Sequence, residues 1–172
     1  MKDLVRERLS INVDVMDLLN KQIAKEAHSS SIYLAMASWC DHNALDNSAH
    51  FFYKQAEEER EHMMKIFKFI NDNGGTAYSP EVKNIPHDYN SLEEIFESAL
   101  EQEIAITKSI HNIVIKCRKV NDFATEHFIQ WFVEEQMEEE QVIRKALDLF
   151  DLMGNNGISI KLIDERIPSI KE

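Results

Sequence analysis

Residues 52–69 read FYKQAEEEREHMMKIFKF, a stretch in which apolar and acidic side chains share one face of a helix. At steps of three and four, this face carries Phe52, Ala56, Glu59, His62 or Met63, Ile66 and Phe69. That spacing predicts an amphipathic α-helix whose striped face packs against other elements. A carboxylate and an imidazole are therefore expected at the interior, where an unpaired charge is costly.

The same periodicity continues in both directions and predicts four long helices and one short one. We expect them from Ser10 or Asn12 to about Asn43, from Asp46 or Asn47 to about Asn73, from the capping sequence Ser91-Leu92-Glu93-Glu94 to about Val120, from about Phe123 to Met153, and from Ile158 to Ile167. Gly74-Gly75 and Gly154-Asn155-Asn156-Gly157 predict helix ends, and Pro168 is expected to end the last segment.

The lengths of the links predict how these helices are connected. Helices one and two, and helices three and four, are joined by short links and must be antiparallel. The link after Gly75 has roughly fifteen residues and can cross the whole bundle. Only 4 glycines and 3 prolines occur in the 172 residues, which disfavours a loop-rich β fold. We expect an all-α, single-domain chain over 1–172: a four-helix bundle with one long crossover loop and a short fifth C-terminal helix.

Each of the other three stripes also carries an acid near its middle. They run Leu19, Ile23, Glu26, Ser30, Tyr33, Ala37; then Phe96, Ala99, Glu103, Ile106, Ile110, Ile113; then Phe128, Phe132, Glu135, Glu139, Val142, Ala146, Leu149. A single such acid could lie at the edge of its stripe and reach water. Four acids at matched depth are not explained in this way. The stripes contain no Lys or Arg, so a shared cation is the solution that removes the repulsion.

The chemistry of these side chains limits which metal ions the site would bind. Oxygen-rich sites with one imidazole suit iron or manganese, with zinc as a competitor. Glu59 and His62 stand at i and i+3, so both can reach one metal, at the depth of Glu26 and Glu103.

Several segments, in order, carry a resemblance to a known family. They are Asn20-Lys21-Gln22-Ile23-Ala24-Lys25-Glu26 with Ser29-Ser30-Ser31-Ile32-Tyr33, Glu57-Glu58-Glu59-Arg60-Glu61-His62-Met63, Trp131-Phe132-Val133-Glu134-Glu135-Gln136-Met137-Glu138-Glu139-Glu140, and the tail from Leu152-Met153-Gly154 through Ile163-Asp164. Together these segments resemble the bacterial non-haem ferritins over nearly the whole chain.

The resemblance implies a ferritin-like di-iron domain and a role for each matching position. Glu26, Glu59 and His62 would hold a first iron, while Glu59 would bridge to a second iron held by Glu103 and Glu139, with Gln136 close by. Glu58, Glu135 and Glu138 would join Glu139 in a third, storage-side site. Tyr33 would lie beside the di-iron centre as part of the catalytic set, with Trp131 near it.

The implied activity is a ferroxidase: oxidation of Fe(II) by dioxygen or hydrogen peroxide, then ferric mineral deposition inside a shell of 24 subunits. Two departures from the related bacterioferritins matter. Gln136-Met137-Glu138-Glu139 replaces a second Glu-x-x-His motif, so iron is expected to pass through the site. Arg60 replaces their haem-ligating methionine, so haem is not expected.

Two other functions fit the same residues. A di-metal oxygenase acting on an organic substrate would need an apolar pocket beside the metals. A non-catalytic helical shell protein would need no metal chemistry at all.

Composition restricts the partners and the compartment. The formal net charge is −12 with no evident basic patch, which disfavours nucleic acid; simple solubility accounts for the charge equally well. No apolar run approaches a membrane span, and residues 1–8 show no secretory signal, so a cytoplasmic protein is expected. Cys40 and Cys117 are expected to be buried, reduced thiols.

Overall fold

The computed structural model describes residues 9–171, so the residues on which the signal prediction rested lie outside it. The described chain is helical throughout, without strands. Its elements are α1 (Val13–His42), α2 (Asp46–Asp72), α3 (Leu92–Val120), α4 (Phe123–Met153), α5 (Gly157–Arg166) and the 3-10 helix η2 (Ile167–Lys171). The prediction of a four-helix bundle with a short C-terminal helix is confirmed. In the part of the chain described, no helix is long and apolar enough to span a membrane.

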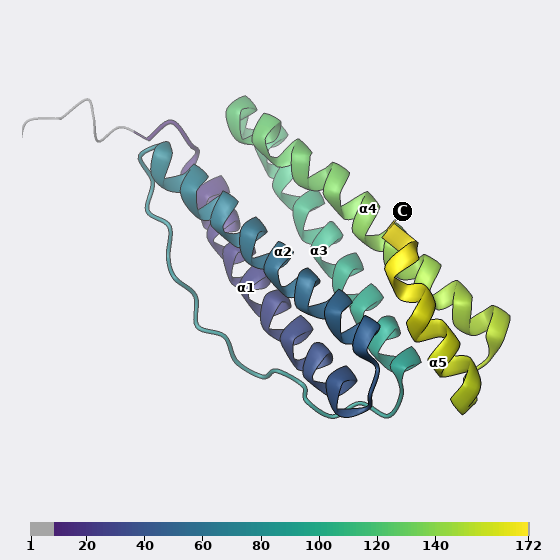
Figure 1. The fold of residues 1–172 in the computed structure, drawn as a ribbon. Helices are drawn as coiled ribbons and strands as arrows, with labels where there is room; N and C mark the ends of the chain where they lie inside the picture. Colours follow the sequence, from purple (N-terminus) through teal and green to yellow (C-terminus); the bar gives the residue numbers. More distant parts are fainter. Residues whose placement is uncertain (1–8, 172) are drawn as a thin grey trace, which may run out of the picture.

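Figure 1 shows α1 to α4 lying side by side, with α1 and α2 antiparallel and α3 and α4 antiparallel. The link from Asn73 to Ser91 runs along the outside of the α1–α2 pair to the opposite end of the bundle, where α3 begins. α5 and η2 pack across α4 and the start of α2. This path is the crossover that the link length predicted.

Local capping explains where the helices begin. Asn12, not Ser10, caps α1 by accepting a hydrogen bond from the Asp14 backbone N–H at 3.0 Å. Ser91 caps α3 through the Glu94 N–H at 3.1 Å. The predicted capping box is modified, because Glu94 accepts from the Asn90 N–H at 2.6 Å instead of reaching Ser91.

Helices α2 and α3 are each followed by a residue with a positive φ, a backbone conformation that glycine and asparagine tolerate best. Gly74, with φ of 81°, follows the C-cap of α2, and Asn121, with φ of 58°, separates α3 from α4. Pro168 does not end the helical segment as predicted. It is the second residue of η2, where its missing N–H is tolerated at a first helical turn, and the segment continues to Lys171.

The apolar core is divided into two clusters by a polar layer. One cluster includes Tyr33, Phe52 and Phe96, and the other includes Leu19, Ile66 and Ile110. Glu26, Glu59 and Glu103 fall between these two sets along their helices. The acids were predicted to lie at similar depths along their helices, and in the structure they form a layer across the middle of the bundle.

The C-terminal helix supplies a cap that α2 lacks. Leu45, at the N-cap position of α2, makes no side-chain cap bond. Asp164 of α5 is buried and accepts from the Ser48 N–H at 2.8 Å and the Ser48 hydroxyl at 2.7 Å. A carboxylate at a helix N-terminus also meets the positive end of the helix dipole. α5 therefore stabilises the first turn of the helix that carries Glu59 and His62.

Asp164→Ala is expected to destabilise the fold by about 1–2 kcal/mol, the usual cost of losing a helix cap. Calorimetric melting should show a fall of roughly 2–8 °C. Glu165→Ala, at an exposed neighbouring position on α5, is the matched control. Equal melting temperatures for the two variants would show that Asp164 does not cap α2.

Candidate metal centre

Three side chains from two helices form a compact group in the polar layer. Glu26 of α1 and Glu59 and His62 of α2 each offer a ligand atom, and these atoms all lie within 4.8 Å of one another. Their exposed fractions are 0, 1 and 5%, so none is hydrated from the surface. The i, i+3 spacing brings His62 Nδ1 to 3.7 Å from Glu59 Oε2. His62, not Met63, is thus the residue that continues the buried stripe.

Two buried oxygens of this group lack protein hydrogen bonds. Glu26 Oε2 and Glu59 Oε2 have no hydrogen-bond partner in the described chain, although a proton on one carboxyl would let it donate to the other. Buried polar atoms are nearly always satisfied, so such orphaned oxygens indicate a missing ligand. Two carboxylates and one imidazole are a donor set that binds iron, manganese or zinc, and the residues present therefore fit a metal ion.

Glu103 and Glu139 complete the layer from α3 and α4. Both are buried, at 0 and 3% exposure. The Tyr33 hydroxyl donates to Glu103 Oε1, and Gln136 Nε2 donates to Glu103 Oε2 at 2.9 Å. Glu139 Oε2 accepts from the amide of Gln55 at 2.6 Å. The structure thus places the predicted second-iron residues in the same layer, with Gln136 beside Glu103.

Burial and mutual repulsion control the protonation of these acids. Burial raises the pKa of Glu26 well above the ordinary carboxyl value, and the charge of Glu59 adds to the rise. The pKa of Glu59 is raised well above its usual range by burial and then by repulsion from Glu103. Burial also raises the pKa of Glu103, against the effect of its two hydrogen bonds. Without a cation, the layer therefore keeps protons to a higher pH than exposed acids do.

Tyr33 remains a hydrogen-bond donor in this environment. Burial, followed by repulsion from Glu103, raises the pKa of its phenol well above the ordinary value. The neutral hydroxyl therefore holds one oxygen of Glu103 in place.

The comparison with known families decides what kind of fold carries this centre. The sequence model of the ferritin-like domain matches residues 16–153, the whole four-helix bundle apart from the first residues of α1. The chain belongs to the ferritin family.

Individual relatives extend this result over the chain. A bacterial non-heme ferritin of Campylobacter jejuni subsp. jejuni is 37% identical over 160 residues, which cover 93% of this chain and 96% of that protein. A bacterial non-heme ferritin of Staphylococcus saprophyticus is 33% identical over 157 residues, covering 91 and 94%. Among solved structures, the open pore ferritin of Archaeoglobus fulgidus superposes with a TM-score of 0.89 and 34% identity, covering 92% of this chain and 96% of that one.

The three further acids of the predicted third site in this ferritin-family chain lie nearer the surface than the acids of the polar layer. Glu58 is half-buried and lies 3.6 Å from Lys54 Nζ, Glu135 is half-buried, and Glu138 is exposed. Among the described residues, only Glu26, Glu59 and His62 meet the metal-group distances. The third site remains a prediction.

Trp131 lies where the resemblance implied, against the ring of His62. The two ring centroids are 5.4 Å apart and meet edge to face. Lys65 Nζ lies 3.3 Å from the centroid of Trp131, so the indole shields this side of His62 and carries a cation on its outer face.

Sequence reasoning missed residues that support the acids. Gln22 donates to Glu26 Oε1 at 2.8 Å and accepts from the Ser109 hydroxyl at 2.6 Å, while Gln55 donates to Glu139. A signal was present, because Gln22 precedes Glu26 and Gln55 precedes Glu59 by four residues, on the same helical face.

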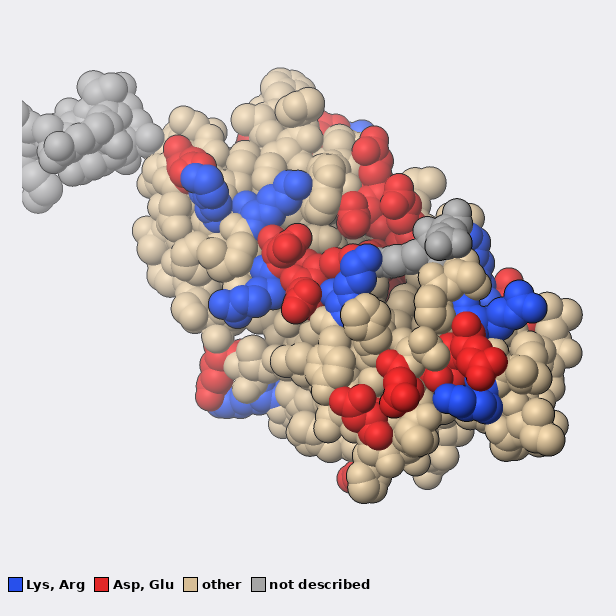
Figure 2. Space-filling view, viewed as in Figure 1, with Lys and Arg blue, Asp and Glu red and all other residues tan. Residues whose placement is uncertain are grey.

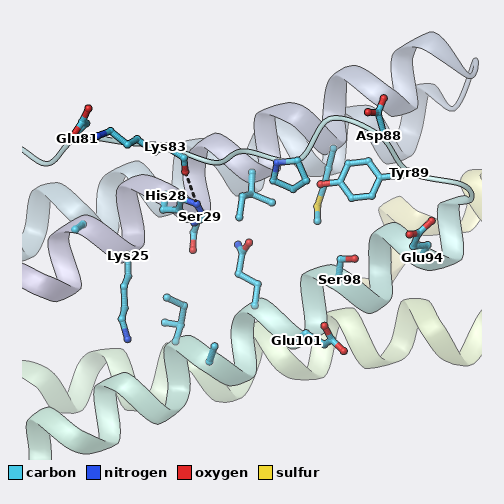
Figure 3. Close-up of a pocket in the computed structure, with 17 residues that line it drawn as sticks. Lys25, His28, Ser29, Glu81, Lys83, Asp88, Tyr89, Glu94, Ser98 and Glu101 are labelled. Atoms are coloured by element: carbon cyan, nitrogen blue, oxygen red, sulfur yellow. Dashed lines mark hydrogen bonds and ion pairs between the residues drawn. The ribbon is translucent and has the colours of Figure 1, made fainter.

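A cavity of about 800 Å³ lies outside the centre, under the crossover link. Its wall comes from α1, the link and α3, and includes His28, Lys83, Tyr89 and Ser98 (Figure 3). None of the five charged or imidazole residues of the polar layer lines it. An organic molecule in this cavity would therefore not contact these five residues, so this cavity is not the apolar pocket beside the metals that the oxygenase alternative requires.

Figure 2 shows acidic and basic side chains interspersed on the face viewed, without one continuous basic patch. The view fits the acidic net charge of −12. The expectation that nucleic acid is not a partner stays a prediction.

Proposed function

We propose that this chain is the subunit of a cytoplasmic iron-storage protein that oxidises Fe(II) in the polar layer and deposits ferric mineral inside an oligomeric shell. The observation that carries the proposal is the buried group of Glu26, Glu59 and His62 with its two orphaned carboxylate oxygens. Membership of the ferritin family and the names of the non-heme ferritin relatives support iron as the metal.

Each residue of the layer has a role in this proposal. Glu26 and His62 bind one Fe(II), Glu103 and Glu139 bind a second, and Glu59 bridges them. Gln136 and Tyr33 fix Glu103 between them. Fe(II) is a substrate here, and the absence of a second Glu-x-x-His motif on α4 favours its onward passage. Glu58, Glu135 and Glu138 are the proposed route to the storage side, and haem is not part of the proposal.

The electron balance explains why two metals are needed. Each Fe(II) loses one electron, and two together reduce dioxygen to hydrogen peroxide, or hydrogen peroxide to water. The protein's part is to hold both ions in a buried layer and to release the carboxyl protons that the ions replace. Because the pKa values of Glu26, Glu59 and Glu103 are raised, these acids hold protons to a higher pH without the metal, and binding displaces the protons that they still carry.

The test combines particle mass with iron oxidation. A shell of 24 chains, each of 20.1 kDa, should scatter light as a particle of about 480 kDa. Stopped-flow absorbance should show rapid oxidation of two Fe(II) per chain, followed by slower mineral growth. A monomer or dimer, or oxidation no faster than in buffer alone, would contradict the proposal.

A further inference from the structure

Three buried glutamines surround the acidic layer, and each donates its amide to a different carboxylate. Gln22 Nε2 lies 2.8 Å from Glu26 Oε1, Gln136 Nε2 lies 2.9 Å from Glu103 Oε2, and Gln55 Nε2 lies 2.6 Å from Glu139 Oε2. Their exposed fractions are 0, 3 and 1%. A hydrogen bond to an ionised group is stronger and more directional than one between neutral groups. Each amide thus fixes one oxygen of its acid.

Amides and cations would affect such acids differently. A Lys or Arg at the same place would neutralise the carboxylate and compete with a bound metal ion. An amide carries no net charge, so it does not compete with the metal for the carboxylates once their protons have been displaced. The glutamine side chains therefore orient the acids without lowering the affinity of the acids for cations.

Gln22 is held at both ends of its amide. Its Oε1 accepts from the Ser109 hydroxyl at 2.6 Å, while its Nε2 donates to Glu26. A flipped amide would bring Oε1 against the ionised carboxylate and lose the bond to Glu26, while Ser109 would have to accept instead of donate. With Glu26 Oε1 held in this way, the other oxygen, Oε2, is the one left without a partner beside Glu59.

We propose that Gln22 is a positioning residue that fixes one oxygen of Glu26 and leaves the other for the metal, with Ser109 holding the amide of Gln22. Gln55 fixes Glu139 Oε2 from the other side of the layer in the same manner. The inference rests on the proposed function for the identity of iron. The orientation of the acid by glutamine would matter for any divalent cation bound in the layer. Residues that hold metal ligands typically change affinity or activity about 10–100-fold when they are removed.

The first experiment replaces Gln22 by methionine, which keeps the length of the side chain and removes the donor. Co(II) alone is the probe, since its visible absorption reports both affinity and coordination geometry. Gln22→Met should raise the Co(II) dissociation constant by about 10–100-fold and change the absorption bands. It should also raise the KM for Fe(II) more than it lowers kcat. Gln55→Met should weaken the second Co(II) equivalent instead of the first.

Gln102→Met is the matched control, because Gln102 lines the outer cavity and lies outside the polar layer. It should bind Co(II) as the unaltered chain does. Wild-type affinity and an unchanged Co(II) spectrum in Gln22→Met would overturn the proposal.

Ser109 offers a test that leaves Gln22 in place. Ser109→Ala frees the amide of Gln22 and should weaken Co(II) binding, while Ser109→Thr keeps the hydroxyl and should restore it. If Gln22→Met does not fold, these two Ser109 variants still test whether Gln22 positions Glu26. Equal Co(II) affinity in both Ser109 variants would contradict the role of Ser109 and Gln22. Failure of the unaltered protein to oxidise Fe(II), with the Gln22 effect on Co(II) intact, would overturn the proposed function alone.

Discussion

Replacing Glu59 and His62 together by alanine is expected to abolish fast Fe(II) oxidation and to leave the assembled particle intact. Glu59 is the proposed bridge between two irons, and His62 is the only imidazole of the described metal group. Loss of residues that merely hold metal ligands costs about 10–100-fold, so removing two ligands should lower the initial rate by more than about 100-fold. Stopped-flow oxidation and light scattering measure the two outcomes.

The control for this variant lies on the same helix. His50 and Glu57 are exposed on α2, and replacing both by alanine removes the same two residue types from the surface. This control should oxidise iron at the unaltered rate. Should Glu59→Ala and His62→Ala fail to fold, Glu59→Gln with His62→Gln keeps the volumes and tests the same loss. Unchanged oxidation in a folded variant would refute the site assignment.

A second large effect is expected in the dependence of stability on pH. The raised pKa values of Glu26, Glu59 and Glu103 mean that the folded, metal-free chain binds more protons than the unfolded chain above the ordinary carboxyl pKa. Stability therefore falls as pH rises from that ordinary value toward the raised ones, by up to about 1.4 kcal/mol per pH unit for each such carboxyl. Below the ordinary carboxyl pKa this destabilisation is absent.

Calorimetry in a metal chelator measures this slope. Glu59→Gln should flatten the fall, because it removes the acid that repels Glu26 and is repelled by Glu103. Added Co(II) should stabilise the unaltered chain more as pH rises, since it replaces protons. Glu61→Gln, an exposed acid on the same helix, is the control and should keep the original slope. Identical slopes for Glu59→Gln and Glu61→Gln would show that the layer does not carry these protons.

The positions of the four acids could be predicted because helical periodicity and burial cost act together. Glu26, Glu59, Glu103 and Glu139 all fall on apolar stripes and are buried. Periodicity did not decide between neighbouring residues at the edge of a stripe, because steps of three and of four both fit a helix. On α4, Glu135 was placed on the stripe, whereas the structure buries Gln136 instead.

The supporting residues required the tertiary structure. Asp164 reaches Ser48 across 116 positions, and Ser109 reaches Gln22 across 87, distances along the chain at which helical periodicity gives no information. Gln22 and Gln55 were not on the predicted stripes, although each precedes a striped acid by four residues. They carry no charge, so their burial alone required no explanation, and their roles became clear only from their partners in the structure.

The central claim is that the polar layer holds two iron ions bridged by Glu59. Crystals soaked anaerobically in Fe(II) and measured on both sides of the iron absorption edge test it most directly. We predict two anomalous peaks inside the bundle, one beside Glu26 and His62 and one beside Glu103 and Glu139, with Glu59 between them. Peaks confined to surface acids, with none in the layer, would contradict the account.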